Sequence, residues 1–164
     1  KKPTLITQES GKIEVKELDI THTNDILFRI GNKNKDSEKT YELEVNFDNV
    51  TINSTSNQTS NGLIQAAYGT MTLNLNMTNV KIDWDKAAGV TTGAIVGGYS
   101  GSKPTLNLTL KDCEIDASGS DGAKAIHVLD GVSGTIKLVG STKNLMKADN
   151  ETLIYNNQMT VSEQ

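Results

Sequence analysis

Apolar and polar residues alternate along three segments of the chain that repeat one another about every thirty residues. The segments span 41–53, 71–83 and 105–116, and Leu43, Leu73 and Leu106 occupy equivalent positions in them. Alternation with a period of two predicts a strand with one buried face. A repeat of this length indicates units that bury their apolar faces only against neighbouring copies.

Each segment breaks its alternation at the same place and then resumes it. The breaks are the pairs Asp48-Asn49, Thr78-Asn79 and Lys111-Asp112. Residues on both sides of the break face one interior, which predicts a sharp bend rather than a hairpin. Because Asn and Asp tolerate the left-handed backbone conformation, Asn49, Asn79 and Asp112 are expected to stack as a column at this bend.

The period extends to both ends of the chain. At a spacing of 30 residues, Ile13 and Val15 align with Leu43 and Val45, Asp19 with Asn49, and Ile136 and Leu138 with Leu106 and Leu108. A further short strand is expected in each period, at 26–30, 63–66, 94–96, 125–128 and 153–155. Three strands in each period predict that each period forms one coil of a solenoid.

The fold predicted is all-β, a right-handed parallel β-helix of about five coils. Strand crossovers are almost always right-handed, and the six-residue rhythm of left-handed coils is absent. We expect residues 1–164 to form a single β-helix domain excised from a longer surface protein. The alternative is an antiparallel sandwich, because the loops at 53–62 and 84–92 contain turn-forming residues.

Composition and charge exclude several classes of protein. The net charge is −4 with no basic stripe, which argues against a nucleic acid partner. No apolar run approaches the roughly 20 residues that a membrane-spanning helix needs, so membrane insertion is not expected. The single cysteine, Cys113, falls at an apolar position of the repeat and is expected to be buried.

The glycine-containing segment 92–101 with 105–116, and the segment 134–140 with Asn144-Leu145, resemble coils of bacterial surface β-helix proteins. These are the pectate-lyase-like adhesive and carbohydrate-binding β-helix domains of Gram-positive bacteria. The resemblance implies an extracellular setting, on the cell surface or secreted. It also implies neighbouring domains and a polysaccharide or host glycan as partner. The chain departs from that pattern in having fewer glycines and longer, charged loops.

Carboxylates on successive loops form the first candidate site. Asp83, Asp85, Asp116 and Asp121 follow the ends of aligned strands, where they could share a Ca²⁺ ion. Some members of the resembled group bind acidic polysaccharide with calcium. A lyase would also need a base, and the only arginine is Arg29. The lack of a basic cluster beside the carboxylates favours a non-catalytic protein, and the alternative for the carboxylates is a role as turn formers.

Aromatic side chains form the second candidate site. Tyr68 and Tyr99 each follow an aligned isoleucine by four residues and are expected to stack in adjacent coils. Trp84 lies just past a strand end, where its ring could stack on a sugar. The alternative is that these rings shield the edges of a small core.

The outward polar positions form the third candidate. Asn74 and Asn107 belong to a predicted column with Glu14, Glu44 and Lys137, whose donors and acceptors could bind a polysaccharide; the alternative is a solvated face. His127 is expected to point outward as a surface residue.

These features together predict a non-catalytic adhesion or carbohydrate-binding module. The alternatives are a fragment of a polysaccharide lyase-like enzyme and a structural spacer.

Overall fold

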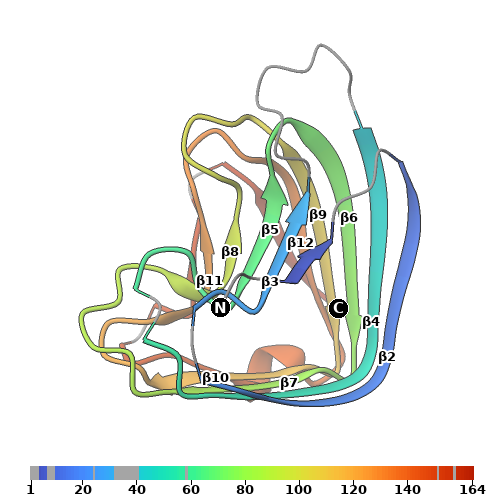
Figure 1. Ribbon diagram of the computed structural model, residues 1–164. Coiled ribbons are helices and arrows are strands. Elements are labelled where there is room, and N and C mark those ends of the chain that lie inside the picture. Colours follow the sequence, from blue (N-terminus) through green and yellow to red (C-terminus); the bar gives the residue numbers. More distant parts are fainter. Residues whose placement is uncertain are drawn as a thin grey trace.

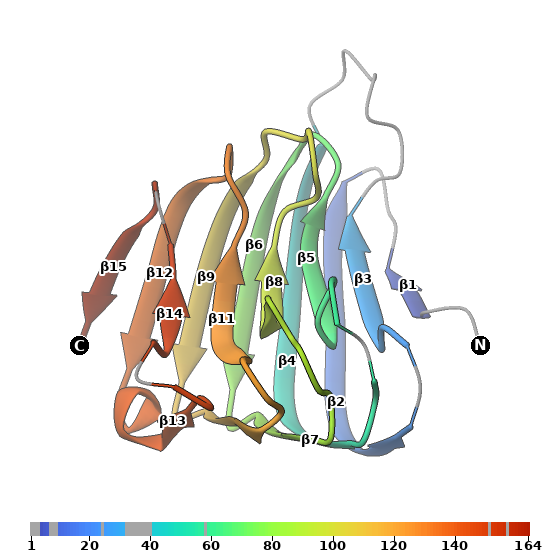
Figure 2. The same cartoon turned by 90° about the vertical axis from the view of Figure 1, so that its left-hand side faces the viewer.

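The structure is a computed structural model, and it describes residues 4–6, 10–23, 25–31, 41–57, 59–150, 152–156 and 158–164. All strand pairs in this part of the chain are parallel, so the antiparallel sandwich is excluded. The strands stack as a β-solenoid of about four turns with a period of about 31 residues. Figures 1 and 2 together show a right-handed turn.

One wall of the solenoid is a six-stranded sheet, which faces the viewer in Figure 2. Its strands, in spatial order, are β1 (Thr4–Ile6), β3 (Phe28–Gly31), β5 (Ile64–Tyr68), β8 (Gly93–Gly97), β11 (Lys124–Val128) and β14 (Ile154–Tyr155). The order follows the chain without inversion, because each turn contributes one strand to the wall.

A nine-stranded sheet forms the other two walls and is folded at a corner (Figure 1). Two strands continue around the corner: β2 (Gly11–His22) and β4 (Tyr41–Ser54). Before the corner lie β6 (Met71–Thr78), β9 (Thr105–Lys111), β12 (Ser133–Val139) and β15 (Thr160–Glu163). After it lie β7 (Lys81–Asp85), β10 (Glu114–Gly119) and β13 (Met146–Lys147), with a short 3₁₀ helix at Thr142–Leu145 before β13.

The corner is the predicted bend. Asn49, Asn79 and Asp112 have φ angles of 53°, 51° and 51°, in the left-handed region. The Asn79 side-chain amide donates to Asn49 Oδ1 at 3.2 Å. Asp112 Oδ1 accepts from the backbone N–H of Ser141 at 3.0 Å, and this hydrogen bonding lowers the pKa of Asp112. The three residues therefore form the predicted column.

The predicted alignment of the first copy is wrong by two residues. Ile13 pairs with Val45 rather than Leu43, and Glu17 rather than Asp19 takes the corner beside Asn49, with φ 52°. The Asn49 side-chain amide donates to Glu17 Oε1 at 2.8 Å. A slip of two keeps every side chain of a straight strand on its face. The break at Lys16-Glu17, before Leu18, marks the observed register, but the fixed spacing of 30 residues passed over it.

The last copy carries the same error in the opposite sense. Ile136 pairs with Leu108 rather than Leu106, and Gly140, with φ 65°, follows the pairing of Val139 with Lys111. The strand-to-strand separations are therefore 32, 30, 33 and 28 residues, counted from Gly11 through Leu43, Leu73 and Leu106 to Gly134.

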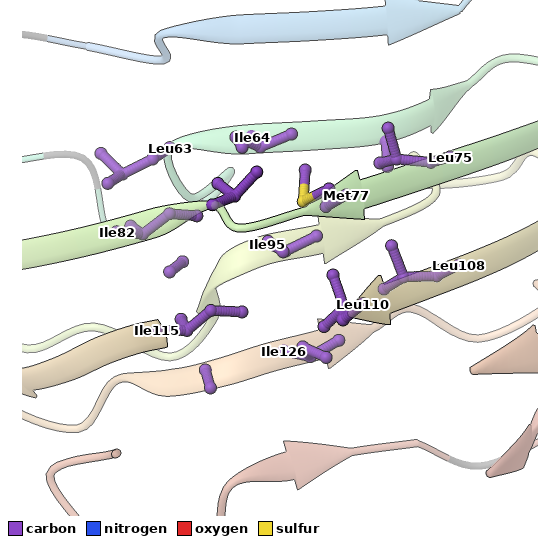
Figure 3. Packing of buried hydrophobic residues seen from close by; sticks show 14 of the residues in the cluster. Leu63, Ile64, Leu75, Met77, Ile82, Ile95, Leu108, Leu110, Ile115 and Ile126 are labelled. Atoms are coloured by element: carbon purple, nitrogen blue, oxygen red, sulfur yellow. The ribbon is translucent and has the colours of Figure 1, made fainter. Parts of the chain in front are cut away.

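The core is a stack of aliphatic layers, as Figure 3 shows. Ile64, Ile95 and Ile126 form one column in the six-stranded sheet, opposite columns of leucine, methionine and isoleucine from the other walls. Cys113 is buried, as predicted, and burial raises the pKa of its thiol to about 11, which keeps it protonated and unreactive. No helix in the described residues is both long enough and apolar enough to cross a membrane.

Candidate functional site: the outer face of the six-stranded sheet

One row of outward-facing side chains crosses the six-stranded sheet. Adjacent strands place Arg29, Gln65, Val96, His127 and Tyr155 in register, each next to an isoleucine or phenylalanine that points inward. The outer face of the third strands therefore carries a different side chain in each coil. Alignment of the predicted third strands would have found this row.

A bulge adds Tyr68 to this face. The pairing of β3 with β5 shifts between Ile30 and Gly31, so that Ala67 is an extra residue with φ 60° and is buried beside Ala66. The inserted residue reverses the alternation, and Tyr68 stands outside next to Arg29.

Tyr68 and Tyr99 stack across adjacent coils, as the sequence predicts. Their ring centroids are 4.4 Å apart with the planes tilted by 54°, and both side chains are partly exposed. The guanidinium carbon of Arg29 lies 4.7 Å from the centre of the Tyr68 ring, and Arg29 Nε donates to Gln65 Oε1 at 2.8 Å. We call these four residues the tyrosine cluster.

The electrostatics of the tyrosine cluster favour a neutral phenol beside a fixed cation. Partial burial and then the neighbouring Tyr99 raise the pKa of Tyr68, while Arg29 opposes the shift. Gln65 is fully buried, so it anchors Arg29 from beneath. Within the described residues no carboxylate lies at ion-pair distance from Arg29. Its positive charge is therefore held in place without an acidic partner from that part of the chain.

A second ring pair lies on the same face. The rings of His127 and Tyr155 are stacked, with centroids 4.7 Å apart and an interplanar angle of 27°. His127 points outward, as predicted, although it is half-buried rather than fully exposed. Burial and then the charge of Lys124 lower the pKa of His127, and Asp130 opposes them.

Trp84 is not part of any exposed platform, and this prediction is wrong. The ring is fully buried, and its Nε1–H donates to the backbone carbonyl of Ser56 at 3.0 Å. Strand β7 continues the alternation that buries Ile82, and the indole completes that series. A ring without exposed surface cannot stack on a sugar.

Asn74 and Asn107 lie on the outer face of the nine-stranded sheet and are bonded to one another. Asn107 Nδ2 donates to Asn74 Oδ1 at 2.9 Å, and Thr135 Oγ1 donates to Asn107 Oδ1 at 3.3 Å. The column is Lys12, Glu44, Asn74, Asn107 and Thr135, so the predicted end members Glu14 and Lys137 belong to the neighbouring column. Side-chain ladders of this kind occupy part of the hydrogen-bonding capacity that a ligand would need.

The four predicted calcium ligands are not gathered into a metal site. Asp83 and Asp116 are cross-strand neighbours, as predicted, but Asp85 is paired with Gly119. Asp116 Oδ2 forms an ion pair with Lys147 at 3.1 Å, and its other oxygen accepts from Ser118. Asp121 lies on the loop that follows β10, where its backbone carbonyl accepts from Val90 N–H at 2.8 Å. Among the described residues no three His, Cys, Asp or Glu side chains are placed to hold one ion.

Comparisons of the chain with models of protein families, with curated proteins and with solved structures gave no match.

Proposed function

We propose that this solenoid is a non-catalytic module that binds glycans outside the cell, through the tyrosine cluster. The observation that carries the proposal is the pair of partly exposed tyrosine rings from adjacent coils, supported by a fixed arginine. Aromatic rings present flat apolar faces with a polar hydroxyl at the edge, which suits the mixed surface of a sugar. No carboxylate of the described residues forms an ion pair with Arg29, and its charge favours a sugar that carries an acidic group.

The positions of the charged groups favour binding over catalysis. A lyase needs carboxylates that hold calcium next to the base. Arg29 lies on β3 in the six-stranded sheet, whereas Asp83 and Asp116 lie on β7 and β10 in the nine-stranded sheet. Moreover, Gln65 and the ring of Tyr68 already engage the Arg29 guanidinium.

Glycan-array binding of the wild type and of a Tyr68→Ala/Tyr99→Ala double variant tests the proposal. We expect the wild type to bind glycans that the double variant does not bind, and to prefer acidic glycans among them. Arg29→Gln should weaken the binding of these acidic glycans. Leu18→Ala is the matched control, because Leu18 is 43% exposed on β2, in the other sheet.

Three results would count against the proposal. Equal binding by the wild type and the double variant would place the site elsewhere. Retention of no glycan would favour the spacer alternative. Cleavage of polygalacturonate would show that the protein is an enzyme.

A further inference from the structure

The His127–Tyr155 pair has the features of a binding surface rather than of core packing. Tyr155 is 41% exposed, on the two-residue strand β14. The two residues are register partners on adjacent strands, and their rings are close to parallel. The pair therefore forms a partly exposed aromatic patch on the outer face of the six-stranded sheet, the face that Figure 2 shows from the front.

The hydrogen-bonding state of His127 decides which ring nitrogen carries the proton. Its Nδ1 is buried and has no partner within the described residues. A buried lone pair costs less than a buried N–H without an acceptor, because an unsatisfied donor loses a strong bond to water. The neutral ring therefore carries its proton on Nε2, which is not among the buried atoms without a partner in the described residues.

The two ring pairs lie on the same face of the solenoid but not in the same row. Tyr68 is in register with Gly31, two positions past the row of Gln65. His127 and Tyr155 belong to the row of Gln65 itself. Tyr68 and Tyr99 belong to β5 and to the turn after β8, while His127 and Tyr155 belong to β11 and β14. The centres of the pairs are two strand spacings apart, which is about 10 Å along the axis. Val96, the neighbour of His127 in its row, is fully buried.

We infer that the outer face of the six-stranded sheet binds a linear polysaccharide that crosses the strands obliquely, from the ends of β5 and β8 to β11 and β14. One sugar stacks at Tyr68 and Tyr99, and a later sugar of the same chain stacks at His127 and Tyr155, where Nε2–H donates to a hydroxyl or ring oxygen. A single sugar cannot reach both pairs, so the arrangement selects chains by length. This inference rests on the proposed function, since it adds a second subsite to the same face.

Isothermal titration with short and long oligosaccharides tests the second subsite. The probes are the disaccharide and the hexasaccharide of galacturonate, of hyaluronan and of cellulose. We expect the wild type to bind at least one hexasaccharide more tightly than its disaccharide. Tyr155→Ala should weaken that hexasaccharide by about threefold to tenfold, the value of one aromatic contact, and leave the disaccharide unchanged.

Two further variants separate binding from folding. Tyr155→Phe keeps the ring and should keep the preference for length. Val161→Ala removes an apolar side chain that is also 41% exposed, but from β15 in the other sheet, and should bind as the wild type does.

The outcomes distinguish this inference from the proposed function. If a ligand of the tyrosine cluster binds equally well at both lengths, or if Tyr155→Ala keeps the preference for length, the second subsite is wrong and the proposed function stands. If the wild type binds none of the six probes and no glycan on the array, both fail.

Discussion

At the scale of single residues, Trp84 shows how hydrogen bonds hold the end of β7 in place, before the loop that leads to β8. The indole is buried, and its N–H satisfies the Ser56 carbonyl in the preceding coil. The next coil continues the same network, because Ser120 Oγ donates to the Trp84 carbonyl at 3.2 Å. Through its side chain and its backbone carbonyl, this one residue therefore connects three successive coils.

Trp84→Ala should destabilise the protein by about 3–5 kcal/mol, through the cavity that it leaves and the loss of the donor to Ser56. Trp84→Phe keeps most of the ring and should cost less. Chemical denaturation followed by circular dichroism measures both. Leu18→Ala, at an exposed site, should stay within about 0.5 kcal/mol of the wild type. A similar value for Trp84→Ala would contradict the burial of the indole.

The burial of Trp84 could have been predicted from the sequence. Val80, Ile82 and Trp84 continue one alternating series, in which every second residue points inward. The prediction instead gave weight to the polar residues Asp83 and Asp85 on either side. The bulge at Ala67 is different, because nothing in the local sequence marks the residue that leaves the ladder and turns Tyr68 outward.

His127 should make stability depend on pH. Desolvation holds its folded-state pKa below the ordinary value of 6.5, with Lys124 adding to the shift, Asp130 opposing it and the Tyr155 ring stacked on it. The unfolded chain therefore binds the proton more readily, so this contribution to stability is present above pH 6.5 and is lost as pH falls through the folded-state pKa.

Thermal melts of the wild type and His127→Gln across this range measure the effect. We expect the wild type to lose thermal stability more steeply on acidification than the variant, which cannot titrate at this position. Parallel curves would show that His127 is equally basic in the folded and unfolded chains.

At the scale of elements, the corner column holds the two halves of each long strand at a fixed angle. The middle three members were predictable because Asn and Asp occur at the same step of each copy. The first and last members were not, since Glu17 and Gly140 do not match that signature. In the first copy the polar pair Lys16-Glu17 still marks the corner through the break in alternation, whereas Gly140 in the last copy carries no such mark.

Asn79→Ala should cost about 1–2 kcal/mol, because alanine resists the left-handed conformation and cannot donate to Asn49. Asn79→Gly removes only the hydrogen bond and should cost less than the alanine variant. Asn53→Ala is the matched control, an exposed asparagine in the extended part of β4. Urea denaturation of the three variants gives the comparison, and a loss in Asn53→Ala equal to that in Asn79→Ala would argue against the corner.

At the scale of the whole molecule, the scaffold and the proposed site come from different positions of the repeat. Inward positions and the corner recur in every copy, which is why the sequence predicted a parallel β-helix. The candidate site uses outward positions of the third strand, and these differ from copy to copy: Arg29, Gln65, Val96, His127 and Tyr155. Because these residues differ in type, the repeat does not single them out, and Arg29 and Gln65 come together only when the third strands are aligned with one another. The sequence therefore indicated Tyr68 and Tyr99 without Arg29 and Gln65 around them.

Stacking of coils also predicts that stability is unequal along the axis. Each coil contacts only its neighbours, so a strand with partners on both sides opens only with them, while an edge strand can open alone. Strand β6 lies between β4 and β9, whereas β15 pairs only with β12 among the described strands. Hydrogen exchange should therefore be slowest in Met71–Thr78 and faster in Thr160–Glu163.

Leu75→Ala separates local from global opening in the same measurement. Leu75 is fully buried in β6, so its truncation should lower the free energy of global unfolding by about 2–5 kcal/mol. Amides of β6 that exchange through global unfolding should then exchange faster, by the same factor by which the equilibrium constant for global unfolding rises. Amides of β15 should keep their rates, because they exchange by local opening. Equal acceleration in both strands would mean that the solenoid opens as one cooperative unit, with coupling beyond neighbouring coils.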